Sequence, residues 1–231
     1  MRKYVLRFFK KSVSFWSNDK SLSLFLISLV VTVFIVYPVA QNHIFWLRCL
    51  AVFIGINFIT GVFLLTQNKF KRLTGIVFAI VTIVISIIDS GTSVNWRIAE
   101  LSLWIIYFIF LALLILKRVF LDEEVNLYRI QGAVAAYIIF GLIFAFIYLI
   151  IYILDSQAFL INERILQTTA HSDYNFVYFS FVTLCTLGYG DISPLSHIAQ
   201  SVSLLEALTG ILFPGILIAR LVGLTGSKKI K

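Results

Sequence analysis

Long apolar runs constrain this chain more than any other feature of its sequence. Six of them approach or reach the roughly 17–25 residues with which an α-helix crosses a bilayer. They cover residues 22–39, 44–66, 73–88, 98–116, 132–154 and 196–224. Charged residues make up only 13% of the chain, about half of their share in soluble domains. The sequence therefore excludes a soluble globular fold and predicts an all-α membrane protein with six transmembrane helices.

The basic residues predict the orientation of these helices. Sixteen of the 19 lysines and arginines lie in the N-terminal tail, the second-to-third and fourth-to-fifth connections, and the C-terminal end. By the positive-inside rule, those segments are cytoplasmic. An even number of spans also places both termini on one side. We therefore expect a multi-pass protein of the cell membrane with both termini cytoplasmic. The net charge of +8 then reflects a membrane surface rather than nucleic-acid binding.

Acidic residues gather at the opposite, outer face. A negative rim there would concentrate cations, whereas the simpler interpretation, which we favour for most of them, is a solvated face. The residues concerned are Asp89, Glu100, Asp155, Glu163, Asp173 and Asp191.

A seventh apolar segment, residues 174–185, is too short to span and reads as a re-entrant helix. Ser172 or Asp173 can cap such a helix at its start. Its C-terminal end, which is partly negative, would point toward the membrane centre. The chain then returns outward, and Pro194 marks the break before the last helix.

The sequence at the end of this re-entrant helix reads Thr-Leu-Cys-Thr-Leu-Gly-Tyr-Gly-Asp, from Thr183 to Asp191. It resembles the selectivity-filter signature of tetrameric potassium channels, with Leu187 in place of the commoner Val or Ile. From about residue 125 to 226 the chain is similar to the two-helix pore domain of that family. The resemblance implies a homotetramer, made with three further copies of the chain and surrounded by membrane lipids. It also implies K⁺ as the permeant ion and no cofactor.

The resemblance identifies the expected K⁺ ligands. In such a filter, backbone carbonyl oxygens replace the hydration shell of the ion. They would come from Thr186, Leu187, Gly188 and Tyr189, with the Thr186 hydroxyl at the inner end. Gly190 completes the filter. Several residues must adopt unusual backbone conformations, some at positive φ, which glycine reaches without a steric penalty.

Side chains around the filter also have expected places. Tyr189 should point away from the ions, into aromatic rings offered by Tyr178, Phe179 and Phe181. Asp191 should lie at the outer mouth, as a surface charge for potassium or as a hydrogen-bond partner of the pore helix. Val182 stands where some relatives carry an acid that pairs with the residue after the filter.

The last helix carries three residues that suggest a hinge or kink, the first of them because the resemblance implies a hinge glycine near its position. They are Gly210, Pro214 and Gly215. A close helix–helix contact is the alternative interpretation, because glycine also serves that purpose in membranes. Glu206 is costly in lipid and should face protein or water. It would form hydrogen bonds behind the filter or act as a proton-sensitive switch, and the first interpretation is preferred.

The domain organisation follows from these segments. Residues 1–116 form an N-terminal tail and a four-helix membrane domain, and 117–131 a cytoplasmic interfacial linker. Residues 132–226 form the pore domain, and 227–231 a short tail, so no soluble ligand domain is expected. Residues 98–116 contain no lysine or arginine. A voltage sensor needs several in one helix, so we expect weak voltage dependence.

The sequence thus favours a potassium-selective channel with passive conduction. A nonselective cation channel and a pore subunit of a K⁺ uptake transporter are the alternatives. An enzyme is not expected, because the three histidines are scattered without metal-ligand spacing. The two cysteines, Cys49 and Cys185, are read as small core residues.

Overall fold

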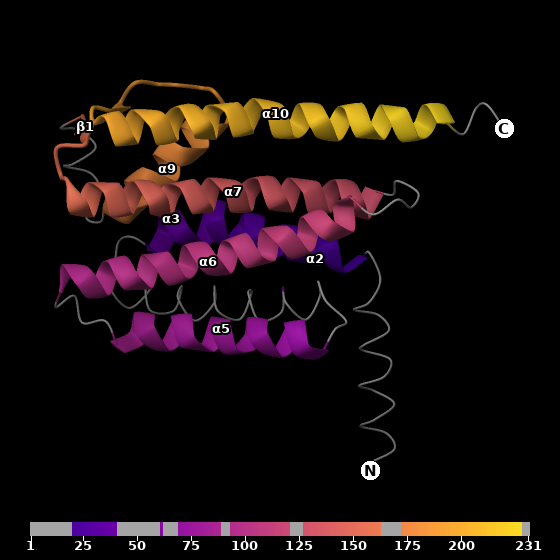
Figure 1. Ribbon diagram of the computed structural model, residues 1–231, viewed down its shortest axis with the longest axis horizontal. Helices are drawn as coiled ribbons and strands as arrows, with labels where there is room; N and C mark the ends of the chain where they lie inside the picture. The colour runs from indigo at the N-terminus through magenta and orange to yellow at the C-terminus, as the bar shows by residue number, and fades with distance from the viewer. Residues whose placement is uncertain are drawn as a thin grey trace, which may run out of the picture.

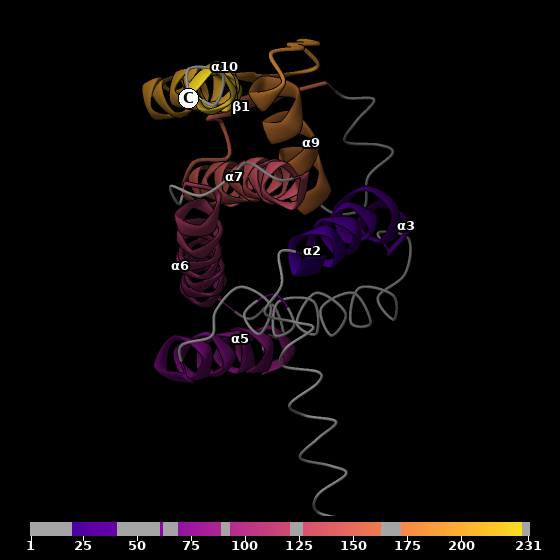
Figure 2. The ribbon, with the colours of Figure 1, turned by 90° about the vertical axis from the view of Figure 1, so that its right-hand side faces the viewer.

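The computed structural model describes residues 20–40, 61, 69–88, 93–120, 127–162 and 172–227. Most of them belong to long helices that run side by side (Figure 1). Figure 2 shows α9 beside α7, with α10 on one side and α2 and α3 on the other. The helices are α2 (Lys20–Val31), the π-helical turn η1 (Thr32–Val36), α3 (Tyr37–Ala40), α5 (Lys69–Ile88), α6 (Val94–Val119), α7 (Leu127–Leu154), α9 (Ser172–Leu184) and α10 (His197–Ser227).

Three helices of the described part are long and apolar enough to cross a membrane. They are α6, α7 and the His197–Arg220 part of α10, and the shorter apolar helix Leu22–Val36 precedes them. These helices match the fourth, fifth, sixth and first apolar runs. The third run falls within α5, and the second lies outside the described residues except for Gly61. The mostly helical membrane fold agrees with the sequence, while the count of six spans stays a prediction.

The interior is built where α6 and α2 pack against α7. Tyr107, Leu111 and Ile115 on α6 are fully buried. They lie in the same cluster as the small residues Ala133 and Ala136 of α7. Small side chains let membrane helices approach closely, where dispersion contacts rather than the hydrophobic effect hold them together. α7 is therefore the central helix of the described structure, between α6 and α9.

The predicted linker, residues 117–131, is divided differently in the structure. α6 continues through Val119, and α7 already begins at Leu127; residues 121–126 lie outside the described part. Lys117 and Arg118 occupy the last turn of α6, where positive charge interacts favourably with the helix dipole. Lys117 and Arg118 at the start of the predicted linker, and Arg129 near its end, thus belong to the two long helices.

A short β-ribbon departs from the predicted all-α fold. β1 (Phe159–Ile161) pairs antiparallel with β2 (Ile192–Pro194), with Leu160 opposite Ser193. The Leu195 N–H donates to the Ala158 carbonyl at 2.8 Å, next to the ribbon. The ribbon therefore fastens the chain that leaves α7 to the chain that enters α10.

Candidate functional site

The site begins at the C-terminal end of α9, which closes with a Schellman motif. The Leu187 N–H donates to the Val182 carbonyl and the Thr186 N–H to the Thr183 carbonyl, each at 2.9 Å. These two bonds satisfy carbonyls that the end of a helix leaves without partners. The motif requires a left-handed residue after the helix cap, and here that residue is Thr186, with φ +57°.

Beyond Thr186 the backbone alternates in a regular way. Thr186, Gly188 and Gly190 have φ of 57°, 58° and 78°, and they are the positive-φ residues of the described chain. Leu187 and Tyr189, between them, are not among these. Added Cβ atoms at Gly188 and Gly190 would meet nothing within 4 Å, so their backbone conformation rather than space explains the glycines. Such alternation allows successive carbonyls to face one side of the chain.

The aromatic surroundings of Tyr189 are smaller than predicted. The Tyr189 ring stacks on Tyr178, with centroids 6.5 Å apart and planes 13° apart. The prediction was wrong for Phe179 and Phe181. Phe179 packs against Tyr148 of α7, and Phe181 lies against Phe34 of η1. Helical spacing explains the error for Phe179, because adjacent residues of a helix do not face the same side.

Asp191 connects the filter segment, residues 186–190, to its surroundings. Its Oδ2 accepts a hydrogen bond from the Tyr178 hydroxyl at 2.6 Å, and its Oδ1 accepts from the Ile192 N–H at 3.0 Å. The Asp191 carbonyl accepts from the Asn162 N–H at 3.0 Å, at the end of β1. Asp191 was expected either as a surface charge for potassium or as a hydrogen-bond partner of the re-entrant helix. Its hydrogen bond with Tyr178 of α9 matches the second expectation.

Gly210 lies where α10 meets the end of α9. A Cβ at Gly210 would stand 2.0 Å from the Leu184 carbonyl oxygen, so only glycine fits. The Tyr137 hydroxyl of α7 donates to the same oxygen at 2.9 Å and lies 3.5 Å from the Gly210 carbonyl. Pro214 has no N–H to give that carbonyl within the helix. The contact therefore matches the close-packing interpretation of Gly210. Gly215 has open space around it.

Glu206 is completely buried and bridges three helices. Its Oε2 accepts a hydrogen bond from the Tyr148 hydroxyl of α7, and its Oε1 accepts one from the Ser180 hydroxyl of α9. The Ser180 Oγ also lies 2.6 Å from the Gly141 carbonyl oxygen, a second acceptor for its single proton. Tyr148 and Ser180 are fully buried as well. Glu206 therefore faces protein, in a hydrogen-bonded cluster with α7 and α9, as the cost of a carboxylate in lipid requires.

Sequence reasoning missed the partners of these groups. The sequence around Tyr137, Tyr148 and Ser180 does not indicate their partners, since each forms a hydrogen bond with a residue at least 26 positions away. Cys185 was also misread, because it is exposed rather than a core residue. A polar side chain on an otherwise apolar helix was the available signal, and it could have suggested that each needed a partner.

Much of α10 lies open in the single chain. In an apolar 18-residue stretch of α10, only 11% of the residues are buried, whereas 61% are buried in the corresponding stretch of α7. Ile211, Ile218 and Val222, whose helical spacing places them on one face with Pro214, are each at least 60% exposed. Leu187 and Tyr189 of the filter segment are also exposed.

Comparison with known proteins covers this same part of the chain. Residues 132–225 match a protein family described as "Ion channel". Over 73 residues, 32% of this chain, the sequence is 34% identical to Two-pore potassium channel 3 of Arabidopsis thaliana, and the match covers 15% of that protein's length. No solved structure matches. The matched family range begins within α7 and ends within α10, so it contains every residue of the site.

Proposed function

We propose that this chain, whose residues 132–225 belong to the ion channel family, is a subunit of a potassium-selective channel in a cell membrane. The chain is a channel protein and not an enzyme. K⁺ would pass down its gradient through a filter made by residues 186–190. The carbonyls of Thr186, Leu187, Gly188 and Tyr189, with the Thr186 hydroxyl, would replace the hydration shell of the ion.

The alternating backbone of the filter segment carries this proposal. A column of carbonyls needs successive peptide groups turned to one side, and positive φ at every second residue supports that arrangement. Leu187 contributes only its carbonyl, so its side chain is compatible with potassium selectivity. An intact signature of this kind favours a selective pore over a nonselective cation channel or a subunit of an uptake transporter.

A homotetramer follows from the incompleteness of one chain. A single filter segment supplies one side of an ion cage, and four copies around an axis close it. The open face of α10 and the exposed Leu187 and Tyr189 side chains are consistent with contacts to further copies. Membrane lipids would cover the remaining apolar surface.

Ion flux into proteoliposomes of the purified protein tests the proposal. We expect flux of K⁺ and Rb⁺ without Na⁺, and loss of this preference in Gly188→Ala, because alanine is strained at φ +58°. Gly215→Ala is the matched control: it has equal space for a Cβ but no positive φ, so the ratio of K⁺ to Na⁺ flux should stay that of the wild type. Equal K⁺ and Na⁺ flux in the wild type would refute potassium selectivity.

A further inference from the structure

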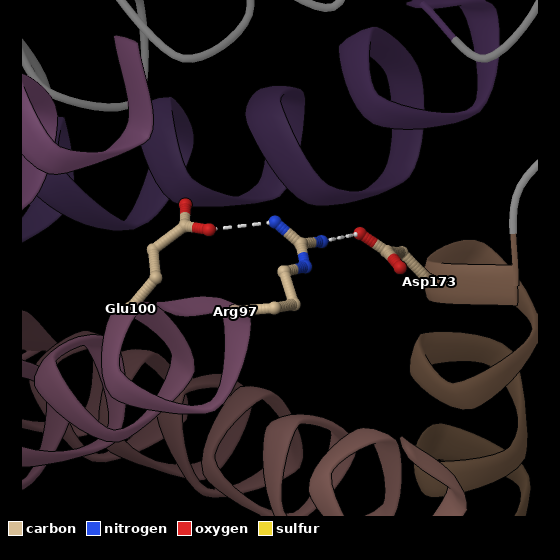
Figure 3. Close-up of polar contacts among 3 residues, drawn as sticks. All are labelled: Arg97, Glu100 and Asp173. Carbon is tan, nitrogen blue, oxygen red and sulfur yellow. Dashed lines mark hydrogen bonds and ion pairs between the residues drawn. The ribbon is translucent and has the colours of Figure 1, made fainter. Parts of the chain in front are cut away.

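Arg97 joins the membrane domain to the start of α9. It lies in the first turn of α6 and extends between two carboxylates (Figure 3). Its Nη1 donates to Glu100 Oε2 at 2.7 Å, and its Nη2 donates to Asp173 Oδ2. Glu100 is one turn further along α6, whereas Asp173 belongs to the first turn of α9. The guanidinium therefore links two helices whose charged residues are 76 positions apart.

The partial burial of these three side chains distinguishes this link from an ordinary ion pair on a protein surface. The Glu100 side chain is 7% exposed, and those of Arg97 and Asp173 are 35% and 33% exposed. A buried carboxylate needs a partner, so Glu100 holds the guanidinium in one place. The planar guanidinium has further donors in a fixed geometry, and one of them is thereby directed at Asp173. Glu100 is therefore not part of a solvated face, whereas Asp173 stays partly exposed.

A second set of contacts joins the first membrane helix to the same side of α9. The Tyr37 ring of α3 lies 5.9 Å from the Tyr174 ring, next to Asp173 in sequence. The Phe34 ring of η1 lies 5.2 Å from that of Phe181, near the other end of α9. Residues before the pore domain thus contact both the first and the last turns of α9.

The end of α9 passes directly into the filter segment. Thr186 and Leu187 are both bonded back to carbonyls of the last turn of α9. A displacement of α9 would therefore carry the first two residues of the filter segment with it. The opposite side of α9 is held to α7 and α10 through Ser180. Loosening the Arg97 contact would therefore leave the Tyr37–Tyr174 ring contact as the described link between the first membrane helix and the start of α9.

We propose that Arg97 is a positioning residue for the filter, which fixes the start of α9 through Asp173 and so lets the membrane domain set the filter geometry. This inference rests on the proposed function for its effect on ion flux. The first four predicted helices lack the charges of a voltage sensor. The proposal gives them another role, which is to position the filter.

Asp173→Asn in the full-length protein is the variant that isolates the link. It leaves the Arg97–Glu100 pair intact, whereas replacing Arg97 would strand the buried Glu100 carboxylate and risk misfolding. Asp155→Asn is the matched control, since Asp155 is an acid just past the end of α7 whose described side-chain hydrogen bond is local, from the Gln157 N–H. Asp173→Glu, which keeps the carboxylate, should rescue at least part of the wild-type behaviour.

Two measurements decide the outcome. In proteoliposomes we expect Asp173→Asn to change Rb⁺ flux or the K⁺/Na⁺ flux ratio by about two- to five-fold, the range that a partly exposed ion pair supports. By hydrogen exchange, we expect faster exchange of the α9, Thr186 and Leu187 amides in Asp173→Asn but not in Asp155→Asn. Wild-type exchange in Asp173→Asn would overturn the positioning role. A wild type without K⁺ preference would refute the proposed function instead, while the exchange result would still decide the role of Arg97.

Discussion

Thr186 combines two requirements at one residue. It ends α9 in a left-handed conformation, φ +57°, that β-branched residues rarely adopt. Glycine would adopt that conformation more easily, yet it would lack the hydroxyl expected at the inner end of the filter. Unfavourable backbone conformations of this kind cost about 1–3 kcal/mol and cluster at functional sites. The strain at Thr186 therefore supports its proposed role as a K⁺ ligand.

At Glu206, the structure predicts that hydrogen-bonding ability matters more than charge. Glu206→Ala would leave Ser180 and Tyr148, both fully buried, without this partner. Each such loss costs about 1–3 kcal/mol. We therefore expect a clear drop in the thermal unfolding midpoint of the purified protein, measured in detergent.

Glu206→Gln is the control for this prediction, because the amide keeps a similar shape and can both donate and accept hydrogen bonds. It should unfold near the wild-type temperature. Equal stability of the alanine variant and the wild type would contradict the importance of the buried cluster.

Among the helices, the crossing of α9 and α10 gives a prediction about Gly210. Alanine there would place its Cβ 2.0 Å from the Leu184 carbonyl oxygen, which is backbone and cannot rotate away. We expect Gly210→Ala to yield little folded protein by size-exclusion chromatography, with Gly215→Ala behaving as the wild type. A hinge without a packing role predicts the opposite result, namely normal yield of Gly210→Ala with altered channel opening.

The sequence predicted helices better than it predicted contacts between them. Apolar length located α6, α7 and α10, because the bilayer sets a minimum length for a spanning helix. The start of α9 was placed at residue 174 and lies at Ser172. The β-ribbon went unpredicted, since strands of three residues leave almost no periodic signal.

Within the site, the sequence predicted positive φ at the glycines of residues 186–190, but not the groups that contact this segment. Local spacing cannot indicate that Arg97 reaches Asp173, or that Tyr137 reaches Leu184. Those pairs depend on how whole helices are placed in space. Positive φ at Thr186 was also unforeseen, because it results from the way in which α9 ends rather than from the residue type.

For the molecule as a whole, the distribution of charge predicts a weak response to voltage. α6 has Arg97 near its start and Lys117 and Arg118 in its last turn, with no basic residue between them. Moving one charge across the membrane is worth about 2.3 kcal/mol per 100 mV, and steep gating needs several such charges. We expect a shallow conductance–voltage curve in planar bilayers. A steep curve, with several gating charges per channel, would contradict this reading of the membrane domain.

α6 is attached to the pore domain at both of its ends. Arg97 reaches α9 near one end. At the other end, Arg220 of α10 donates to the Phe120 carbonyl at 2.8 Å and lies 4.8 Å from the centre of the Phe120 ring. The described residues of α6 and its C-cap thus contact α9 at its first turn and α10 at Arg220.

The Arg97 bridge has a reciprocal thermodynamic consequence. If the bridge favours the filter geometry that binds K⁺, bound K⁺ must favour the bridge by the same free energy. Replacing K⁺ by Na⁺ would then loosen the outer end of α6, far along the chain from any ion ligand. A lipid or protein whose binding to the membrane domain depends on this bridge would then bind with an affinity that depends on potassium.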